Sequence, residues 1–241
     1  MMRAPVSNLP IAFEEVSVEA GGRMILDRVK LTISAGPPTI LIGPNGSGKT
    51  TLLRTAMGLL PPSRGRLTWG GQETGVPAKR ALLFQRPVML RRSAAANIRY
   101  ALRSAGIPRN EHNTRIEQLL DQVGLDGFGE RPARRMSNGE QQRLALARAL
   151  AREPTVLFLD EPTASLDPAA TKAVEEVIRT VAEGGIKIVM STHDLGEARR
   201  LAGDVVLLHR GRVIEHAPVS VFFRAPQTPE ASAFLAGELL L

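Results

Sequence analysis

A glycine-rich segment with a lysine and a threonine lies between an apolar run and a helical pattern. Residues 43–50 match the spacing G-x-x-x-x-G-K-[ST], and residues 39–42 before them have the β-branched, apolar character of a short buried strand. Backbone N–H groups and the positive end of the helix dipole can surround phosphate oxygens there, which a side chain at Gly46 or Gly48 would obstruct. The alternative is an ordinary glycine turn with a chance lysine, and the flanking strand and helix disfavour it.

This segment is therefore predicted to bind a nucleoside triphosphate together with Mg²⁺. Lys49 would neutralise the outer phosphates, and the Thr50 hydroxyl would ligate the metal. The predicted nucleotide-binding residues of the segment are Gly43, Pro44, Asn45, Gly46, Ser47, Gly48, Lys49, Thr50 and Thr51.

Two adjacent carboxylates follow a second apolar run. Residues 156–159 are Val-Leu-Phe-Leu and lead directly into Asp160 and Glu161. Because side chains alternate along a strand, we expect the two carboxylates to point in different directions and to have different roles. Asp160 is predicted to hold Mg²⁺, and Glu161 to polarise the attacking water. A solvated pair at a strand end is the alternative, and the phosphate-binding segment in the same predicted sheet argues against it.

A histidine follows a third apolar run. Residues 186–191 lead into Thr192 and His193. The carboxyl ends of parallel strands are where such sheets bind ligands, so His193 is predicted to contact the γ-phosphate or Glu161. A purely structural histidine is the alternative. The chain's other histidines, His112, His209 and His216, have no comparable setting.

The order of apolar runs predicts an α/β fold with a mainly parallel sheet. Strand and helix patterns alternate on both sides of residues 93–152, which carry helical patterns at 93–105, 111–123 and 137–152 with no convincing strand between them. The predicted strands are 11–18, 29–33, 39–42, 66–69, 80–84, 155–159, 186–191, 204–208 and 212–215, and the remaining predicted helices are 50–60, 168–183, 195–202 and 231–235.

Composition excludes several classes of protein. With 241 residues, 43% hydrophobic side chains and no cysteine, the chain can bury a core but has no disulfide, thiolate metal site or thiol nucleophile. The net charge of +7 comes from scattered basic pairs and is accompanied by few aromatic residues, so we expect no nucleic-acid partner. No stretch approaches the roughly 18 apolar residues that cross a bilayer, which predicts a cytosolic chain unless a partner anchors it.

One segment points to a family. Residues 136–143, Met-Ser-Asn-Gly-Glu-Gln-Gln-Arg, resemble the signature motif LSGGQ-x-QR of the ATP-binding cassette (ABC) ATPases, and the other motifs agree with that family in order and spacing. The resemblance covers almost the whole chain. It implies one domain of the ABC-type P-loop fold over residues 1–241. Residues 1–85 and 153–241 would form a RecA-like core with an N-terminal antiparallel β part, and residues 86–152 a helical subdomain.

The resemblance also implies roles for single residues. Lys49, Glu161 and His193, the switch histidine, would be catalytic. Gln85 would be the Q-loop glutamine that contacts ATP and Mg²⁺, alongside Thr50 and Asp160. Ser137, Asn138, Gly139 and Glu140 would form the signature, and Ser165, Leu166 and Asp167 the D-loop. In the family, two copies pack head to tail, and the signature of each faces the γ-phosphate bound by the other.

The chain departs from the family pattern at two places. Met136, Asn138 and Glu140 replace leucine, glycine and glutamine, and Glu140 adds a negative charge that should disfavour the closed dimer unless an Arg or Lys compensates it. Family members stack adenine on an aromatic residue before the first hairpin turn, where this chain has Glu19 and Ala20. Phe13 is expected in the core, and Arg23 could stack instead. Weak adenine contact and loose nucleotide selectivity are therefore expected.

The Q-loop region suggests what the hydrolysis drives. Residues 84–93, with Asn97 and Ile98, resemble bacterial importer ATPases for oxyanions, especially tungstate. This resemblance implies a membrane permease that docks a coupling helix here, an indirect link to a solute-binding protein, and a peripheral position on the cytoplasmic side of the inner membrane. Three alternatives stay open: an exporter ATPase, a soluble ABC ATPase outside transport, and a module that binds nucleotide without hydrolysing it.

Overall fold

The computed structural model describes residues 8–238, and the chain divides into two compact units. The first unit comprises Met1–Pro77 with Lys187–Leu241, and the second comprises Ala78–Ile186. This division into units does not test the predicted helical subdomain, so its boundaries at residues 86 and 152 stay a prediction.

The first unit begins with an antiparallel sheet in the order β2-β1-β4. Its strands are β1 (Ile11–Ala20), β2 (Arg23–Ile33) and β4 (Arg64–Trp69). Gly21 and Gly22 have φ of 59° and 73°, which suits the two-residue turns that join hairpin strands. The chain therefore reverses at once, and β2 starts six residues before the predicted 29, where polar side chains had hidden the strand pattern.

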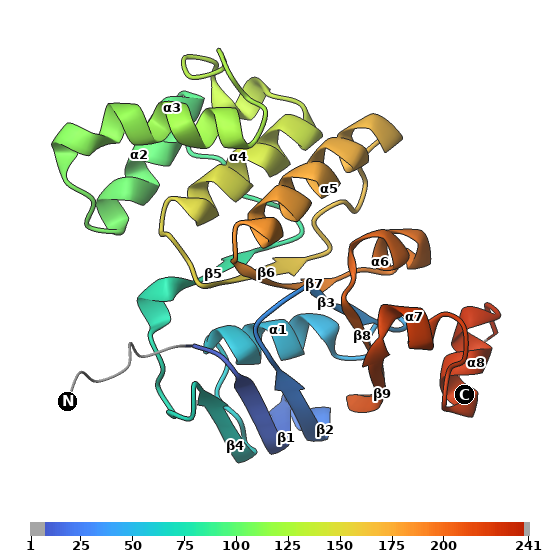
Figure 1. The fold of residues 1–241 in the computed structure, drawn as a ribbon. Helices are drawn as coiled ribbons and strands as arrows, with labels where there is room; N and C mark the ends of the chain where they lie inside the picture. The colour runs from blue at the N-terminus through green and yellow to red at the C-terminus, as the bar shows by residue number, and fades with distance from the viewer. Residues whose placement is uncertain (1–7, 239–241) are drawn as a thin grey trace. The chain divides into compact units, whose positions relative to one another are not determined.

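A second sheet of this unit has the strand order β7-β3-β8-β9. The central strand β3 (Thr39–Ile42) runs parallel to β7 (Lys187–Ser191) and β8 (Asp204–His209), while β9 (Arg212–Pro218) is antiparallel to β8. Every residue of β3 and β7 is buried. Helix α1 (Lys49–Met57) lies between the two sheets (Figure 1) and accepts a 2.7 Å hydrogen bond from the Trp69 indole at its Ala56 carbonyl. The unit's other α-helices are α6 (Leu195–Leu201), α7 (Val219–Phe222) and α8 (Pro229–Leu235).

A polar cluster links the first residues of β3, β7 and β8. Asp204 accepts a 2.8 Å hydrogen bond from the Thr39 hydroxyl, contacts His216, and lies 4.0 Å from the Lys187 ammonium. Burial alone would raise the pKa of Asp204, but the hydrogen bonds from His216 and Thr39 and the charge of Lys187 together lower it below its usual value.

The second unit holds four helices and two parallel strands. The helices are α2 (Ala94–Ser104), α3 (His112–Gln122), α4 (Asn138–Leu150) and α5 (Pro168–Glu183), and the strands are β5 (Arg80–Leu83) and β6 (Val156–Asp160). Helix α4 is the centre of this unit, in contact with α2, α3, α5 and β5 (Figure 1). Its Leu-Ala-Leu-Ala run is buried on all sides, which explains why its amphipathic pattern is weak.

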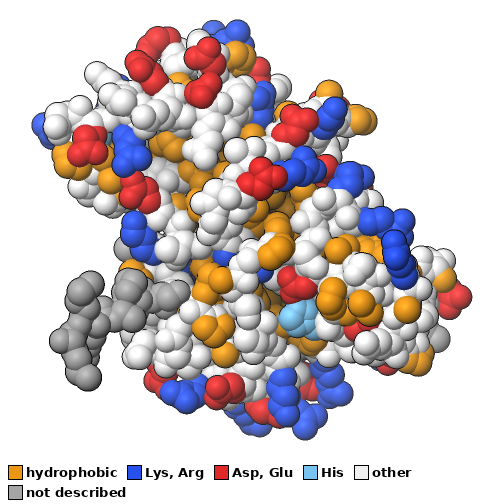
Figure 2. Space-filling view, viewed as in Figure 1, with side chains coloured by type: hydrophobic (Ala, Val, Ile, Leu, Met, Phe, Trp, Pro, Cys, Tyr) orange, Lys and Arg blue, Asp and Glu red, His pale blue; other side chains and the backbone are white. Residues whose placement is uncertain are grey.

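The predicted α/β fold with a mainly parallel core sheet, an antiparallel part and helices is confirmed. The three helices predicted within residues 93–152 are α2, α3 and α4, whereas α7 had no predicted counterpart. None of the helices in residues 8–238 combines the length and the apolar character needed to cross a membrane. Figure 2 shows the Lys and Arg side chains of one face in several separate groups with Asp and Glu among them.

Candidate functional site

The glycine-rich segment enters α1 in a form suited to an anion. Gly48 is the N-cap of α1 in a left-handed conformation (φ 107°), and no side chain caps the helix, unlike α2, α4, α5 and α6. The hydroxyl of Ser47 is buried without a hydrogen-bond partner. The Lys49 ammonium donates to the carbonyls of Gly43 (2.8 Å) and Pro44 (3.2 Å), which holds it over the loop. Uncapped N–H groups, an unpaired hydroxyl and a cation fit phosphate oxygens.

Close packing explains two of the glycines in this loop. A Cβ at Gly43 would come within 2.1 Å of the Leu208 carbonyl oxygen, and one at Gly48 within 2.9 Å of Leu26 Cδ2. At Gly46 nothing lies within 4 Å, so there the positive φ of 78° calls for glycine instead. At Gly48, a side chain would therefore clash with Leu26, in addition to the predicted obstruction of phosphate.

His193 follows β7 at the same sheet edge as this loop. Strands β3 and β7 are parallel neighbours, Leu41 pairs with Ser191, and the Thr192 N–H donates to the Leu41 carbonyl (3.0 Å). Asp194 caps α6 through its carboxylate, which fixes the backbone on the far side of His193. The histidine itself is exposed. Its predicted place at a strand's carboxyl end is observed, and its contact with phosphate stays a prediction.

The carboxylate pair lies at the end of β6 in the second unit. Asp160 is the last strand residue and is only 7% exposed, whereas Glu161 is partly exposed and has φ 46°. Strand alternation does not reach Glu161, because its left-handed backbone already lies beyond the strand; the different roles of the two carboxylates stay a prediction. The amide of Gln85 donates to Glu161 Oε2 at 3.4 Å, so two residues predicted from separate motifs meet here.

The predicted metal ligands are of the right chemical kind for magnesium. Thr50, Gln85 and Asp160 offer hydroxyl, amide and carboxylate oxygens, the hard donors that Mg²⁺ prefers. No group of three or more His, Cys, Asp or Glu side chains suited to a metal occurs in the described part of the chain. Mg²⁺ commonly uses one or two carboxylates with substrate phosphates, so the donor set fits a metal that arrives with its nucleotide.

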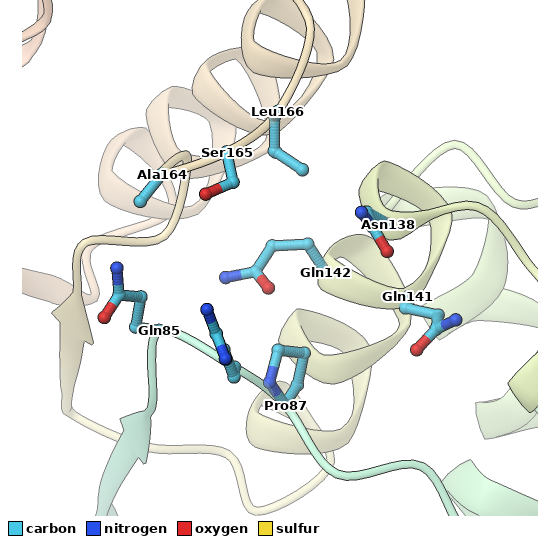
Figure 3. Close-up of a pocket in the computed structure, with 9 residues that line it drawn as sticks. Gln85, Pro87, Asn138, Gln141, Gln142, Ala164, Ser165 and Leu166 are labelled. Carbon is cyan, nitrogen blue, oxygen red and sulfur yellow. The ribbon is translucent and has the colours of Figure 1, made fainter.

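Three motifs line one cavity of about 350 Å³ within the second unit (Figure 3). They are the Q-loop glutamine with the two residues after it, the first turns of α4, and the first two D-loop residues with Ala164 before them. The lining residues are Gln85, Arg86, Pro87, Asn138, Gln141, Gln142, Ala164, Ser165 and Leu166. The predictions missed Gln142 here, although its spacing of four residues from Asn138 places both on one helix face. The third D-loop residue, Asp167, caps α5 by accepting from the Ala170 N–H.

The signature segment opens α4 with a capping box. The Ser137 hydroxyl accepts from the Glu140 N–H (3.2 Å), and Glu140 Oε2 accepts from the Ser137 N–H (2.7 Å). The second carboxylate oxygen of Glu140 lies 3.8 Å from Arg131, whose guanidinium stacks 3.7 Å above the Phe128 ring. Arg131 therefore supplies the compensating charge that the sequence analysis required for Glu140.

The other signature residues have structural reasons of their own. A Cβ at Gly139 would lie 2.7 Å from Ala170 Cβ, so glycine lets α4 pack against α5. Asn138 is the first helical residue and has no positive φ, so the backbone does not require glycine there. Met136 is 6% exposed and fills the apolar position that leucine has in the family pattern.

The hairpin beside the phosphate loop contains no exposed aromatic side chain among the described residues. Phe13 is 3% exposed and belongs to the core, as predicted, while Glu19, Ala20 and Arg23 are exposed. Met24 in β2 is 47% exposed, next to Ile25, whose carbonyl oxygen would lie 3.1 Å from a Cβ at Gly48. The exposed side chains that this hairpin could offer to a base are therefore the Met24 thioether and the Arg23 guanidinium, and their contact with a base stays a prediction.

Comparison with protein families decides the identity of the chain. Residues 26–164 match the family model described as "ABC transporter". The chain belongs to the ABC transporter ATPases. This ABC domain is 38% identical over 231 residues to the Fe(3+) ions import ATP-binding protein FbpC of Streptomyces avermitilis, an alignment that covers 93% of this chain and 67% of the relative. It is 37% identical over 216 residues to the tungstate uptake system ATP-binding protein TupC of Peptoclostridium acidaminophilum, covering 89% and 98%.

A solved structure agrees with this assignment. The ABC domain superposes on cbiO1 from Clostridium perfringens, part of the ABC transporter complex cbiONQ, with a TM-score of 0.82 and 27% identity over 90% of this chain and 91% of that one. The predicted family is thus confirmed, and with it the ATP-hydrolysing activity that defines ABC ATPases.

Proposed function

We propose that this ABC ATPase is the motor subunit of a bacterial importer of an oxyanion such as tungstate. The proposed solute class is supported by the match to the tungstate uptake ATPase, which extends along 98% of that relative's length. The iron import relative is equally similar in sequence but is aligned along 67% of its length. Iron import is therefore the second candidate.

Two copies would pair head to tail around two molecules of MgATP. In each half, the loop at residues 43–51 and Lys49 bind the phosphates, and the first turn of the partner's α4 faces the γ-phosphate. Glu161 then polarises water, with Gln85 held beside it at 3.4 Å and His193 next to the phosphate. Support comes from the Ser137 hydroxyl, which accepts the capping bond and still has its own proton to donate.

A permease would dock on the second unit near the Q-loop. Three large hydrophobic side chains are exposed there: Phe84, Val88 and Tyr100, with 45%, 76% and 54% of their surface accessible. The backbone under them is fixed from other elements, because Arg148 donates to the Val88 carbonyl at 2.6 Å and Arg134 to the Met89 carbonyl at 3.1 Å. Burial lowers the pKa of Arg148. Exposed apolar side chains on a segment held by hydrogen bonds from other elements are typical of a surface that binds another protein. The partner would be the membrane permease, bound on the cytoplasmic side, and the permease would in turn bind a solute-binding protein.

Exchange of the motor in a working transporter tests this proposal. The chain is expressed with the tungstate permease and binding protein of Peptoclostridium acidaminophilum in cells that lack TupC, and tungstate uptake is measured by mass spectrometry. Uptake should be restored by the chain and not by its Lys49→Ala variant. The matched experiment uses the iron permease of Streptomyces avermitilis. Rescue of iron uptake without rescue of tungstate uptake would contradict the oxyanion proposal and favour the second candidate.

A further inference from the structure

Gln142 is a buried glutamine whose amide nitrogen has no hydrogen-bond partner. The side chain is 3% exposed, and Nε2 is unpaired. It lies on α4 one turn after Asn138 and lines the cavity shared by the three motifs. A buried amide without a partner costs free energy comparable to a lost hydrogen bond, so its retention calls for an explanation.

The neighbouring glutamines of this cavity are paired. The Gln85 amide donates to Glu161, and the Gln141 amide donates to the Met136 carbonyl at 2.7 Å. Neither therefore needs a new acceptor, and the unpaired amide donor among these three glutamines is Gln142 Nε2.

An acceptor of the right chemical kind, the Ser165 hydroxyl, lines the same cavity. Figure 3 shows the Gln142 amide and the Ser165 hydroxyl both projecting into the cavity, the first from α4 and the second from the turn before α5. Ser165 has φ 67°, and Glu161, four residues earlier in the same turn, has φ 46°. Left-handed backbone is unfavourable for residues with a Cβ, so this turn stores strain that a rearrangement can release.

We infer that Gln142 is a positioning residue that donates a hydrogen bond to Ser165 Oγ when nucleotide-bound chains pair. The inference rests on the proposed head-to-tail pairing. The bond ties the turn at residues 161–165 to the first turns of α4, so that Glu161 and the signature take up their working positions together. The unpaired donor and the strained turn both favour this change.

A double-mutant cycle measures the bond. Gln142→Met and Ser165→Ala are made singly and together in the Glu161→Gln variant, and dimerisation in MgATP is followed by analytical ultracentrifugation. Each single change should weaken dimerisation by about fivefold to a hundredfold, the scale of two net hydrogen bonds, because the dimer contains one such bond in each chain. The double variant should be no weaker than the singles. In the chain that keeps Glu161, Gln142→Met should lower kcat for ATP hydrolysis with little change in KM for ATP.

The nucleotide-free melting temperature separates positioning from structural support. Gln142→Met should leave it unchanged or raise it, because the amide has no bond to lose. The control Gln141→Met removes an existing bond and should lower it, without coupling to Ser165. Additive effects in the cycle, or a loss of melting temperature with Gln142→Met as large as with Gln141→Met, would overturn the inference. If the Glu161→Gln parent itself stays monomeric in MgATP, the proposed pairing fails and the inference falls with it.

Discussion

Replacing Arg131 with alanine is expected to weaken the ATP-bound dimer by exposing the negative charge of Glu140. The guanidinium lies 3.8 Å from the carboxylate, and its side chain is 58% exposed. This ion pair is present in the monomer and the dimer alike, so the dimer is weakened by repulsion between the uncompensated carboxylate and the triphosphate that it faces, which for exposed charges amounts to roughly 0.2–1 kcal/mol at each site. A head-to-tail dimer contains two such sites, so the loss should be about 0.4–2 kcal/mol, or roughly twofold to thirtyfold in the dimerisation constant.

The assay is sedimentation of Glu161→Gln variants in MgATP at two salt concentrations. The double variant Arg131→Ala, Glu140→Gln restores neutrality and should dimerise nearly as the parent does, since glutamine can also accept from the Ser137 N–H. Glu140→Gln alone should tighten the dimer by no more than Arg131→Ala weakens it. All differences should shrink near 1 M salt, where screening acts within about 3 Å. The reasoning is refuted if Arg131→Ala dimerises normally, or if the double variant stays as weak as Arg131→Ala.

Three further predictions concern the nucleotide site and the sheet. Lys49→Ala should abolish ATP binding in calorimetry, because the loop loses its only neutralising side chain within residues 43–50; unchanged affinity would contradict the phosphate assignment. Competition with GTP should show less than about a tenfold preference for ATP, because a thioether and a guanidinium give the base few specific contacts; a hundredfold preference would show that base recognition has been missed. The carboxylate of Asp204 has a folded-state pKa below its unfolded value, so it stabilises the fold at neutral pH and loses this effect as pH falls below about 4. Asp204→Asn should therefore have a lower free energy of unfolding at pH 7, and that free energy should fall less steeply as the pH is lowered through the acidic range, measured by urea unfolding. An unchanged dependence on pH would show that the Asp204 carboxylate does not contribute to stability in this way.

The sequence predicted what depends on local pattern. The phosphate loop and the placement of His193 after β7 follow from spacing and from strand and helix signals over a few residues. The family resemblance supplied the roles of Gln85 and the D-loop, which no local pattern would have suggested.

Long-range packing was beyond the sequence. The pairing of Arg131 with Glu140 and the contact of Gly139 with Ala170 join residues whose proximity depends on tertiary structure. The positive φ of Glu161 likewise has no signal in its residue type, because glutamate rarely adopts it. The sequence therefore could not show that the strand ends at Asp160 and that alternation does not apply to Glu161.

In the proposed dimer, each ATP lies between the loop of one chain and the signature of another. A crystal structure of the Glu161→Gln variant with MgATP would show this arrangement. It should contain a head-to-tail dimer in which Ser137 Oγ lies within hydrogen-bond distance of the γ-phosphate bound to Lys49 of the other chain. A nucleotide-bound structure in which Ser137 contacts no γ-phosphate in any pairing of chains would contradict it.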